Sequence, residues 1–225
     1  MVRSGENDFS ALDLSADKKR ALELTPVSNE VALRLDRLVA LFLERQTKMN
    51  LVARSTLPQL WTRHIADSLQ LVALEPSAQV WIDLGSGGGF PGLVIACVLA
   101  GRAGARVHLV ESTKKKAVFL EEAARALELP AVVHPVRIED FAATFAQRCD
   151  IVTARALAPL DKLLELAAPL LKTGAKGLFL KGQDVEAELT DAAKCWTIKS
   201  TLVPSKTNPL ARVVVIHSAA RRDKQ

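Results

Sequence analysis

A glycine-rich stretch that begins at residue 85 constrains this 225-residue chain more than any other feature. Val80 to Leu84 form an apolar run typical of a buried strand, and four of the next five residues are glycine. Glycine adopts backbone conformations with positive φ and lets a ligand approach the main chain closely. Pro91 suits a first helical turn, and the apolar run from Leu93 to Ala100 continues the helix. The stretch therefore predicts a strand, turn and helix that bind a nucleotide-type cofactor.

Two cofactors fit this turn. Gly87, Gly89 and Gly92 match the dinucleotide pattern, in which a pyrophosphate lies on a helix N-terminus. Asp83 followed by Gly85, Gly87 and Gly89 matches the acid-x-Gly-x-Gly-x-Gly loop of S-adenosylmethionine (AdoMet) methyltransferases. A carboxylate at the strand end repels a pyrophosphate but attracts the ammonium and sulfonium groups of AdoMet, so its charge favours AdoMet. A glycine turn without a ligand is the third alternative.

Composition and charge indicate the domain size, the cellular location and the kind of partner to expect. With 49% hydrophobic residues, the chain can bury a full core, and its length suits one α/β domain with a modest extension. Cys97, Cys149 and Cys195 form no C-x-x-C pair and have no histidine cluster nearby, which predicts a reducing, cytoplasmic location and no metal. We expect no secretory signal and no membrane segment, since no apolar run approaches about 18 residues. The net charge of +5 is compatible with a nucleic-acid partner.

The N-terminal third of the chain is predicted to be helical. Residues 1–27 have weak periodicity and predict a partly ordered leader. Residues 28–76 predict an N-terminal helical cap, because apolar residues recur there at helical spacing. Two helices are expected in this cap, over residues 29–47 and 57–74.

Histidines occur at four positions, and one has an acid one helical turn away. His64 and Asp67 fit either a catalytic pair or a tie between the cap and the core. The tie is favoured because nothing nearby supplies a nucleophile. His108, His134 and His217 occur singly in strand-like runs, where a packed or surface imidazole is the default.

Residues 77–225 alternate between strand and helix patterns. Strands are predicted over residues 80–84, 106–110, 131–136, 149–153 and 177–180, each followed by a helix, and a last pair near 196–203 and 211–217. This order predicts an α/β fold with the seven-stranded, Rossmann-like sheet of AdoMet-dependent methyltransferases, whose last strand is antiparallel. The cap and this AdoMet-binding domain are expected to form one compact unit.

Acidic residues follow two of the predicted strands. Glu111 comes directly after the second strand, at the sheet edge where ligands bind in open α/β sheets. A carboxylate there accepts hydrogen bonds from the ribose hydroxyls of NAD or of AdoMet, and it also fits as an N-cap of the next helix. After the third strand, Glu139 is placed to accept from an adenine amine, and Ile138 offers an apolar wall for the ring.

Basic residues border the same edge. Lys114, Lys115 and Lys116 open the helix after the second strand, although three cations at a helix start oppose the helix dipole. They fit a solvated face and phosphate contacts with a nucleic acid equally well. Arg155 lies in the loop over residues 154–159, which the fourth strand is expected to deliver to the site.

In their joint order and spacing, these residues resemble the bacterial small-subunit ribosomal RNA guanine-N7 methyltransferases called RsmG or GidB. The similarity runs from about residue 50 to residue 180. It is carried by Asn50-Leu51, Arg63-His64-Ile65 with Asp67-Ser68-Leu69, the Asp83 to Gly92 loop, Glu111-Ser112 with Lys115 and Lys116, Arg137-Ile138-Glu139, Thr153-Ala154-Arg155-Ala156, and Leu180-Lys181-Gly182.

The resemblance implies AdoMet-dependent transfer of a methyl group to N7 of one guanine in 16S rRNA, with rRNA or the 30S subunit as partner. We also expect a monomer. By matching position, the cofactor contacts are Gly85, Phe90, Ile138, Glu139 and Arg155, with Asp83 and Glu111 close by and Gly87 and Gly89 in the same loop. Many relatives carry Asp where Glu111 stands, which leaves the ribose geometry open. The rRNA surface is predicted beside this site, on Lys114, Lys115, Lys116 and Arg137 with the cap helices.

The chemistry expected of such a site is simple. Guanine N7 has a free lone pair and needs no deprotonation, so the enzyme has to orient it and exclude water. Arg155 is therefore expected to position the reacting groups and not to carry a proton. No Asp/Asn-Pro-Pro-Tyr/Phe loop and no Pro-Cys follow the fourth strand, which disfavours amine methylation and thiolate chemistry.

Two rival functions remain open. An NAD-linked oxidoreductase would use the same glycines and Glu111, but the chain has no tyrosine to serve as a hydride-site acid. A protein that binds RNA and merely retains the AdoMet fold is the alternative that is not an enzyme.

Overall fold

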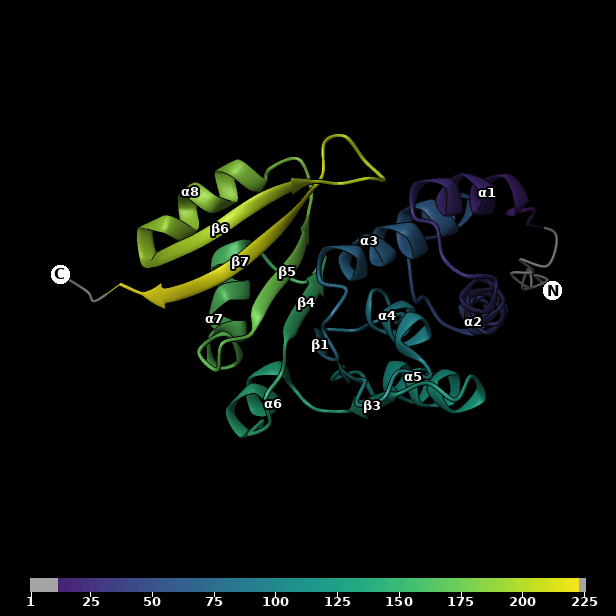
Figure 1. Cartoon of the computed structure of the whole chain (residues 1–225), viewed down its shortest axis with the longest axis horizontal. Coiled ribbons are helices and arrows are strands. Elements are labelled where there is room, and N and C mark those ends of the chain that lie inside the picture. Colours follow the sequence, from purple (N-terminus) through teal and green to yellow (C-terminus); the bar gives the residue numbers. More distant parts are fainter. Residues whose placement is uncertain (1–11, 223–225) are drawn as a thin grey trace, which may run out of the picture.

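The computed structural model describes residues 12–222, which contain a seven-stranded sheet with helices on both faces (Figure 1). The strand order is β3-β2-β1-β4-β5-β7-β6. β1 to β5 are parallel, and β7 runs antiparallel to both β5 and β6, so the predicted α/β methyltransferase sheet is confirmed. The strands are β1 (Val80–Leu84), β2 (Arg106–Val110), β3 (Ala131–His134), β4 (Ile151–Arg155), β5 (Lys176–Lys181), β6 (Trp196–Pro204) and β7 (Arg212–Arg221).

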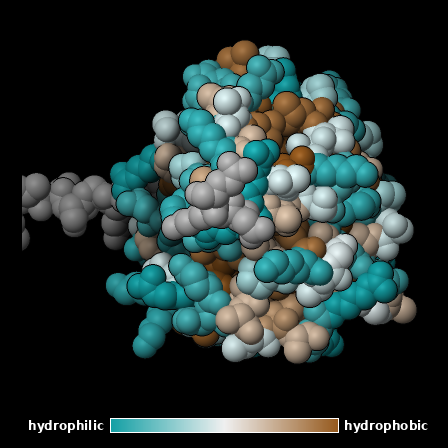
Figure 2. Space-filling model, turned by 90° about the vertical axis from the view of Figure 1, so that its left-hand side faces the viewer, coloured by the Kyte–Doolittle hydropathy of each residue, from teal (hydrophilic) through white to brown (hydrophobic). Residues whose placement is uncertain are grey.

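Helices divide between the two faces because neighbouring residues of a strand point to opposite sides of the sheet. Trp81 packs with α4, α5 and the cap, whereas Ile82 and Leu84 pack with α6, α7 and α8. Both faces are therefore apolar, as is usual for a parallel sheet. The helices are α4 (Gly92–Leu99), α5 (Lys114–Ala126), α6 (Ile138–Thr144), α7 (Leu160–Leu171) and α8 (Val185–Cys195). At the end formed by β6, β7 and α8, hydrophilic side chains surround smaller hydrophobic areas (Figure 2).

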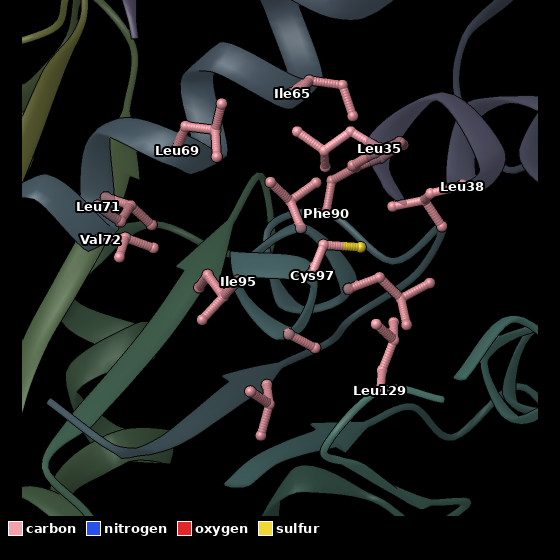
Figure 3. Packing of buried hydrophobic residues seen from close by; sticks show 14 of the residues in the cluster. Leu35, Leu38, Ile65, Leu69, Leu71, Val72, Phe90, Ile95, Cys97 and Leu129 are labelled. Atoms are coloured by element: carbon pink, nitrogen blue, oxygen red, sulfur yellow. The ribbon is translucent and has the colours of Figure 1, made fainter. Parts of the chain in front are cut away.

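The N-terminal cap packs directly on α4. Leu35 and Leu38 of the cap lie beside Phe90, and Ile95 and Cys97 of α4 lie below them (Figure 3). All five side chains are almost fully buried, which makes this contact part of one continuous core. The cap comprises α1 (Ser15–Leu24), α2 (Asn29–Lys48), the 3₁₀ helix η1 (Arg54–Gln59), the π-helix η2 (Trp61–Ala66) and α3 (Asp67–Leu74).

The second cap helix differs from its prediction. One continuous helix was expected over residues 57–74, whereas η1, η2 and α3 occupy this segment. Pro58 lies inside η1, and proline has no N–H to donate to an α-helical bond. The wider π-helical turn that follows is uncommon and often occurs at functional sites. Periodicity alone does not distinguish these three helix types.

Part of the predicted leader is an ordered helix. α1 contributes Asp17, whose Oδ2 accepts hydrogen bonds from the backbone N–H groups of Trp61 at 2.8 Å and Thr62 at 3.2 Å. The Thr62 hydroxyl donates to the other oxygen of the same carboxylate. Asp17 thus satisfies the first free donors of η2. The only buried residue of α1 is Ala21, which explains its weak periodicity. Residues 1–11 of the leader lie outside the described residues.

Two strands also end at other residues than predicted. β4 starts at Ile151 and not at residue 149, and the side chain of Asp150 bonds to the backbone at the start of β1. Its Oδ2 accepts from the backbone N–H groups of Gln79 at 2.9 Å and Val80 at 3.0 Å. β3 ends at His134, immediately before Pro135, which cannot donate to a ladder.

No helix within residues 12–222 is long and apolar enough to cross a membrane.

Gly92→Ala should destabilise the fold. A Cβ at this position would lie 2.2 Å from Leu109 Cδ2 and 2.7 Å from Asp83 Oδ2, so side chains of two strands would have to move. Overpacking of this kind costs about 1–3 kcal/mol, and urea unfolding measures it. Gly182→Ala is the control, since nothing lies within 4 Å of its Cβ position and its backbone is unstrained. Equal stability of the two variants would contradict the close packing at Gly92.

Candidate functional site

The glycine-rich turn forms a tight loop between β1 and α4. Gly85, Gly87 and Gly89 have φ values of 69°, 55° and 89°, a region that favours glycine. The backbone N–H groups of Gly85 and Ser86 both donate to the carbonyl of Val110, at 2.9 and 3.0 Å. The loop is therefore held against the end of β2, the strand next to β1.

The carboxylate of Asp83 lies beneath this loop and stabilises it through hydrogen bonds. Its Oδ2 accepts from the backbone N–H of Gly92 at 3.1 Å, and its Oδ1 accepts from the Thr153 hydroxyl at 3.1 Å. Burial raises the pKa of Asp83 to about 6, with only 1% of the residue exposed. The structure thus places this predicted cofactor residue beneath the loop, where its charge acts through the backbone.

Glu111 lies at the end of β2, beside the loop. Its Oε2 accepts from the backbone N–H of Gly87 at 2.9 Å, and its Oε1 accepts from that of Thr113 at 2.7 Å. The carboxylate therefore orients the loop and also holds the first turn before α5. Each oxygen of an ionised carboxylate has a second lone pair, so both can still accept from a ligand hydroxyl.

Phe90 joins the cap, the loop and β4. Its ring lies 5.1 Å from the Phe42 ring and stacks on His64, with ring centroids 5.1 Å apart. The Arg155 guanidinium lies over the same ring at 5.7 Å, within range of a cation–π contact. Phe90 is nearly buried by these neighbours, so its position is set by packing.

Arg155 comes from the end of β4, as predicted. Its Nη1 donates to the carbonyl of Arg63 at 3.3 Å, and burial lowers the pKa of its guanidinium, against the attraction of Asp67 and Asp83. The next residue, Ala156, has φ 49°, a strained conformation for a residue with a Cβ. This turn lets Leu157 pack over Gly85, where an added Cβ would lie 2.7 Å from Leu157 Cδ1.

A cavity of about 740 Å³ opens beside Arg155, at the carboxyl ends of β4 and β5. This volume lies within the range of roughly 300–1,000 Å³ that is typical of small-molecule sites. Its walls are the cap, the strand ends and the loop between β6 and β7. The lining residues are Gln59, Arg63, His64, Asp67, Arg155, Ala156, Leu157, Ala158, Pro159, Leu180, Lys181, Gly182, Glu188, Thr207, Asn208, Pro209 and Ala211.

His64 and Asp67 both line this cavity but do not bond to each other. His64 Nε2 lies 3.0 Å from the Thr56 hydroxyl, whereas Asp67 Oδ1 accepts from Gln70 and Thr207. Burial, followed by the charges of Arg155 and Arg63, lowers the pKa of His64 to about 3. The imidazole is thus neutral near pH 7, and this geometry favours the tie between cap and core over the catalytic pair.

The remaining predicted residues lie on the β3 side of the loop, away from the cavity. Ile138 and Glu139 begin α6, and Glu139 borders a separate hollow between α6 and α7. Lys114 and Lys115 are exposed at the start of α5, Lys116 is half-buried there, and Arg137 is exposed before α6. The structure therefore brings Asp83, Gly85, Gly87, Gly89, Phe90, Glu111 and Arg155 together, and it sets the four cations apart from the cavity.

Two histidines that were expected to lie singly are in contact. His108 Nδ1 lies 2.9 Å from His134 Nε2, because β2 and β3 pair in parallel and bring these residues to neighbouring positions. Phe141 and Phe145 pack around the pair. Burial, followed by the charges of His134 and Arg106, lowers the pKa of His108 to about 4, so this cluster is neutral and part of the core.

Within residues 12–222, no cysteine, serine or tyrosine lines the cavity, and its one histidine, His64, has a pKa of about 3 and is therefore a weak base. Burial raises the pKa of the Cys97 thiol to about 12 and that of Cys149 to about 11, which makes both inert. Among residues 12–222, no group of three or more His, Cys, Asp or Glu side chains is arranged to hold a metal ion. The site is suited to binding and orienting two ligands side by side.

Residues 205–211 are the part of the site that the sequence did not reveal. This loop between β6 and β7 closes the cavity, and it lies more than 100 residues from the glycine turn in the sequence. Its Asn208-Pro209 step is an ordinary turn signal, so no local pattern marks it as functional.

Sequence comparison finds one family along most of the chain. The family described as rRNA small subunit methyltransferase G matches residues 32–213. A protein named Ribosomal RNA small subunit methyltransferase G from Bradyrhizobium sp. (strain BTAi1) is 58% identical over 93% of this chain and 95% of its own length. One of the same name from Nitrobacter hamburgensis is 58% identical over 99% of this chain and 84% of its own.

Solved structures show the same fold at low identity. A putative O-methyltransferase from Klebsiella pneumoniae has a TM-score of 0.58 and 12% identity, covering 91% of this chain and 97% of its own. The O-methyltransferase from Bacillus cereus, solved in complex with SAH, has a TM-score of 0.56 and 13% identity, covering 91% of this chain and 98% of its own. These similarities establish the fold alone.

The neutral His64 should make folding stability depend on pH. Its folded pKa of about 3 lies below the ordinary value of 6.5, so between these values the unfolded chain takes up a proton that the folded protein does not. The stabilisation from His64 is complete above pH 6.5 and is lost as the pH falls. His64→Asn should therefore flatten the dependence of the unfolding free energy on pH by about 1.4 kcal/mol per pH unit between pH 6 and 4.

Urea unfolding at several pH values measures this slope, and His217→Asn, at an exposed position of β7, is the matched control. If the slopes of His64→Asn and wild type coincided, His64 would not be held in its neutral form.

Proposed function

The chain belongs to the rRNA small subunit methyltransferase G family, and from this premise we propose that it methylates N7 of a guanine in 16S rRNA with AdoMet as the methyl donor. One observation supports this most strongly. A glycine loop, with Asp83 at the end of β1 and Glu111 at the end of β2, lies beside a cavity that no cysteine lines and whose histidine is a weak base. Guanine N7 is an acceptor that requires neither a strong general base nor an enzyme nucleophile.

The residues around the loop fit AdoMet. Gly85, Gly87 and Gly89 leave the backbone open to a ligand, and a side chain at Gly85 would be blocked by Leu157. Glu111 can accept from the ribose hydroxyls, Ile138 offers apolar surface, and Glu139 offers an acceptor at the adenine side, while the buried Phe90 fixes the position of the loop. When bound, AdoMet supplies an electrophilic methyl group on a positively charged sulfur. The buried negative charge of Asp83 below the loop favours that cation.

The residues of this chain contribute orientation and exclusion of water. Arg155 lies between the loop and the cavity, where its planar guanidinium can hold either ligand. His64 is neutral and stacked on Phe90, so it forms a wall without adding charge. An orientation effect of this kind can supply an effective molarity on the order of 10⁵ M or more.

The rRNA is proposed to contact the rim on both sides of the loop. Lys114, Lys115, Lys116 and Arg137 remain the proposed contacts on the β3 side, since cations without a partner attract phosphates. In the described residues, none of these four forms an ion pair within the protein. Exposed Arg63 and Lys206 lie on the cavity side and extend this surface.

We also propose that the enzyme acts as a cytoplasmic monomer without a metal. One chain provides the glycine loop and every wall of the cavity, so the site needs no second copy. Cys97, Cys149 and Cys195 are free thiols, which suits a reducing compartment. Sedimentation of the purified protein tests the monomer.

Two measurements test the proposed function. Wild-type protein should transfer labelled methyl groups from AdoMet to unmodified 30S subunits, with the label mapping to one guanine N7, and calorimetry should detect AdoMet but not NAD. Glu111→Ala removes the ribose acceptor and should weaken AdoMet binding by about 1–3 kcal/mol. Glu121→Ala, an exposed acid on α5, is the control. Tight NAD binding without methyl transfer would support the oxidoreductase, and rRNA binding without transfer would support the RNA-binding protein.

Arg155→Lys should lose most of the methyl transfer although it keeps the charge. Lysine cannot reproduce the planar, bidentate contacts of the guanidinium, nor its position over Phe90. The pH profile between about 6 and 9 should keep its shape, because no group that titrates in that range has been removed. Single-turnover rates measure both effects. If the lysine variant kept nearly the wild-type turnover, Arg155 would not position the reacting groups.

A further inference from the structure

Among residues 12–222, Asp67 is the one carboxylate of the cap that lines the cavity, and one of its two oxygens is free. Oδ1 is occupied, since it accepts from Gln70 Nε2 and from the Thr207 hydroxyl, both at 2.8 Å. Within residues 12–222, no hydrogen bond or ion pair engages Oδ2. The buried side-chain atoms that lack a partner there are His64 Nδ1 and His108 Nε2, so Oδ2 is not sealed in the protein. Because Asp67 lines the cavity, this oxygen is available to a ligand there.

A network across the cavity mouth holds this carboxylate in place. Gln70 accepts from the backbone N–H of Lys206 at 3.0 Å and donates to Ser205 Oγ at 3.3 Å, and Thr207 and Ser205 bond to each other at 3.0 Å. Gln70 and Ser205 are almost completely buried. Figure 1 shows the loop between β6 and β7 reaching above the sheet toward α3, where these bonds form. Asp67 is therefore held in place before any ligand binds. A group that is held in this way can select a ligand at a low cost in conformational entropy.

The surroundings leave this carboxylate short of hydrogen-bond donors. Burial raises the pKa of Asp67, although its bonds to Thr207 and Gln70 and the charges of Arg155 and Arg63 oppose the increase. Neither arginine forms an ion pair with it. A ligand that presents neutral N–H donors would supply what Oδ2 lacks.

We propose that the cavity receives the target guanine base, and that Asp67 Oδ2 accepts hydrogen bonds from the guanine N1–H and its exocyclic amine. This inference rests on the proposed function, and it names the residue that selects guanine. The Watson–Crick edge then faces the cap, and the opposite edge with N7 faces Arg155 and the glycine loop. A base must leave its stack to be read in this way. Adenine would present the unprotonated N1 to the carboxylate, which repels it, so the contact also rejects adenine.

The test uses 30S subunits reconstituted from 16S rRNA that carries either guanine or inosine at the position mapped as methylated. Inosine retains N7, O6 and N1–H but lacks the exocyclic amine. Wild type should prefer guanine in kcat/KM by roughly 10- to 100-fold, the effect of one charge-assisted hydrogen bond together with the intrinsic reactivities of the bases. Those reactivities are the same for every variant, so a change in the ratio reports the contact.

Asp67→Asn should remove most of this preference. Asparagine keeps one oxygen for Gln70 and Thr207 and places an amine where Oδ2 was, so the loop is held but the acceptor is lost. Its affinity for AdoMet, measured by calorimetry, should stay unchanged. Asp140→Asn is the matched control, because it makes the same change at an exposed position of α6 that does not line the cavity, and it should keep the wild-type ratio. Asp67→Ser serves if the asparagine variant folds poorly.

The possible results distinguish the role of Asp67 from the proposed methyl transfer. If wild type methylates guanine subunits and Asp67→Asn keeps the wild-type ratio of guanine to inosine, the role of Asp67 is wrong and the proposed function stands. If wild type methylates neither subunit, the proposed function is wrong, and the inference that rests on it is overturned with it.

Discussion

The buried carboxylate of Asp83 is the contact on which the rest of the site depends. It accepts from the first backbone N–H of α4 and from Thr153 of β4, so a single side chain connects β1, the helix after the glycine turn and the neighbouring strand. An unpaired carboxylate at this depth would be strongly destabilising, and its pKa shows that burial is only partly offset. The close packing of Gly92 against it explains why glycine is needed where the turn meets α4.

Phe90 extends this organisation to the cap. Its ring is covered by Phe42, His64 and Arg155, which come from α2, η2 and β4. Figure 3 shows Phe90 between the cap residues Leu35 and Leu38 and the α4 residues Ile95 and Cys97, in the core that joins the cap to the sheet. Movement of the cap would therefore disturb the cofactor loop and the cavity together. The Asp17 contacts to the start of η2 hold the π-helical turn that carries Arg63 and His64.

The cavity is assembled from segments that are distant in the sequence. Asp67 and Thr207, which are hydrogen-bonded, are 140 residues apart. Lys181, at the end of β5, forms an ion pair with Glu188 at 2.5 Å and also donates to the carbonyl of Ala158. That arrangement pairs the charge of Lys181 and leaves the guanidinium groups of Arg63 and Arg155 as the cations that line the cavity. Together with the free oxygen of Asp67, these walls suit a base that carries both hydrogen-bond donors and acceptors.

The fold class, the order of the strands along the chain and the cofactor loop follow from the amino-acid sequence alone. These features depend on local patterns: apolar runs of strand length, glycines where φ must be positive, and acids that directly follow strands. Most residues predicted at the loop do meet there, because parallel strands end at the same edge of the sheet. Three further features appear only in the folded protein: the contact of His108 with His134, the division of residues 54–74 into three kinds of helix, and the closure of the cavity by residues 205–211. Those outcomes depend on hydrogen bonds and packing between segments far apart in the chain, which leave no periodic pattern in either segment.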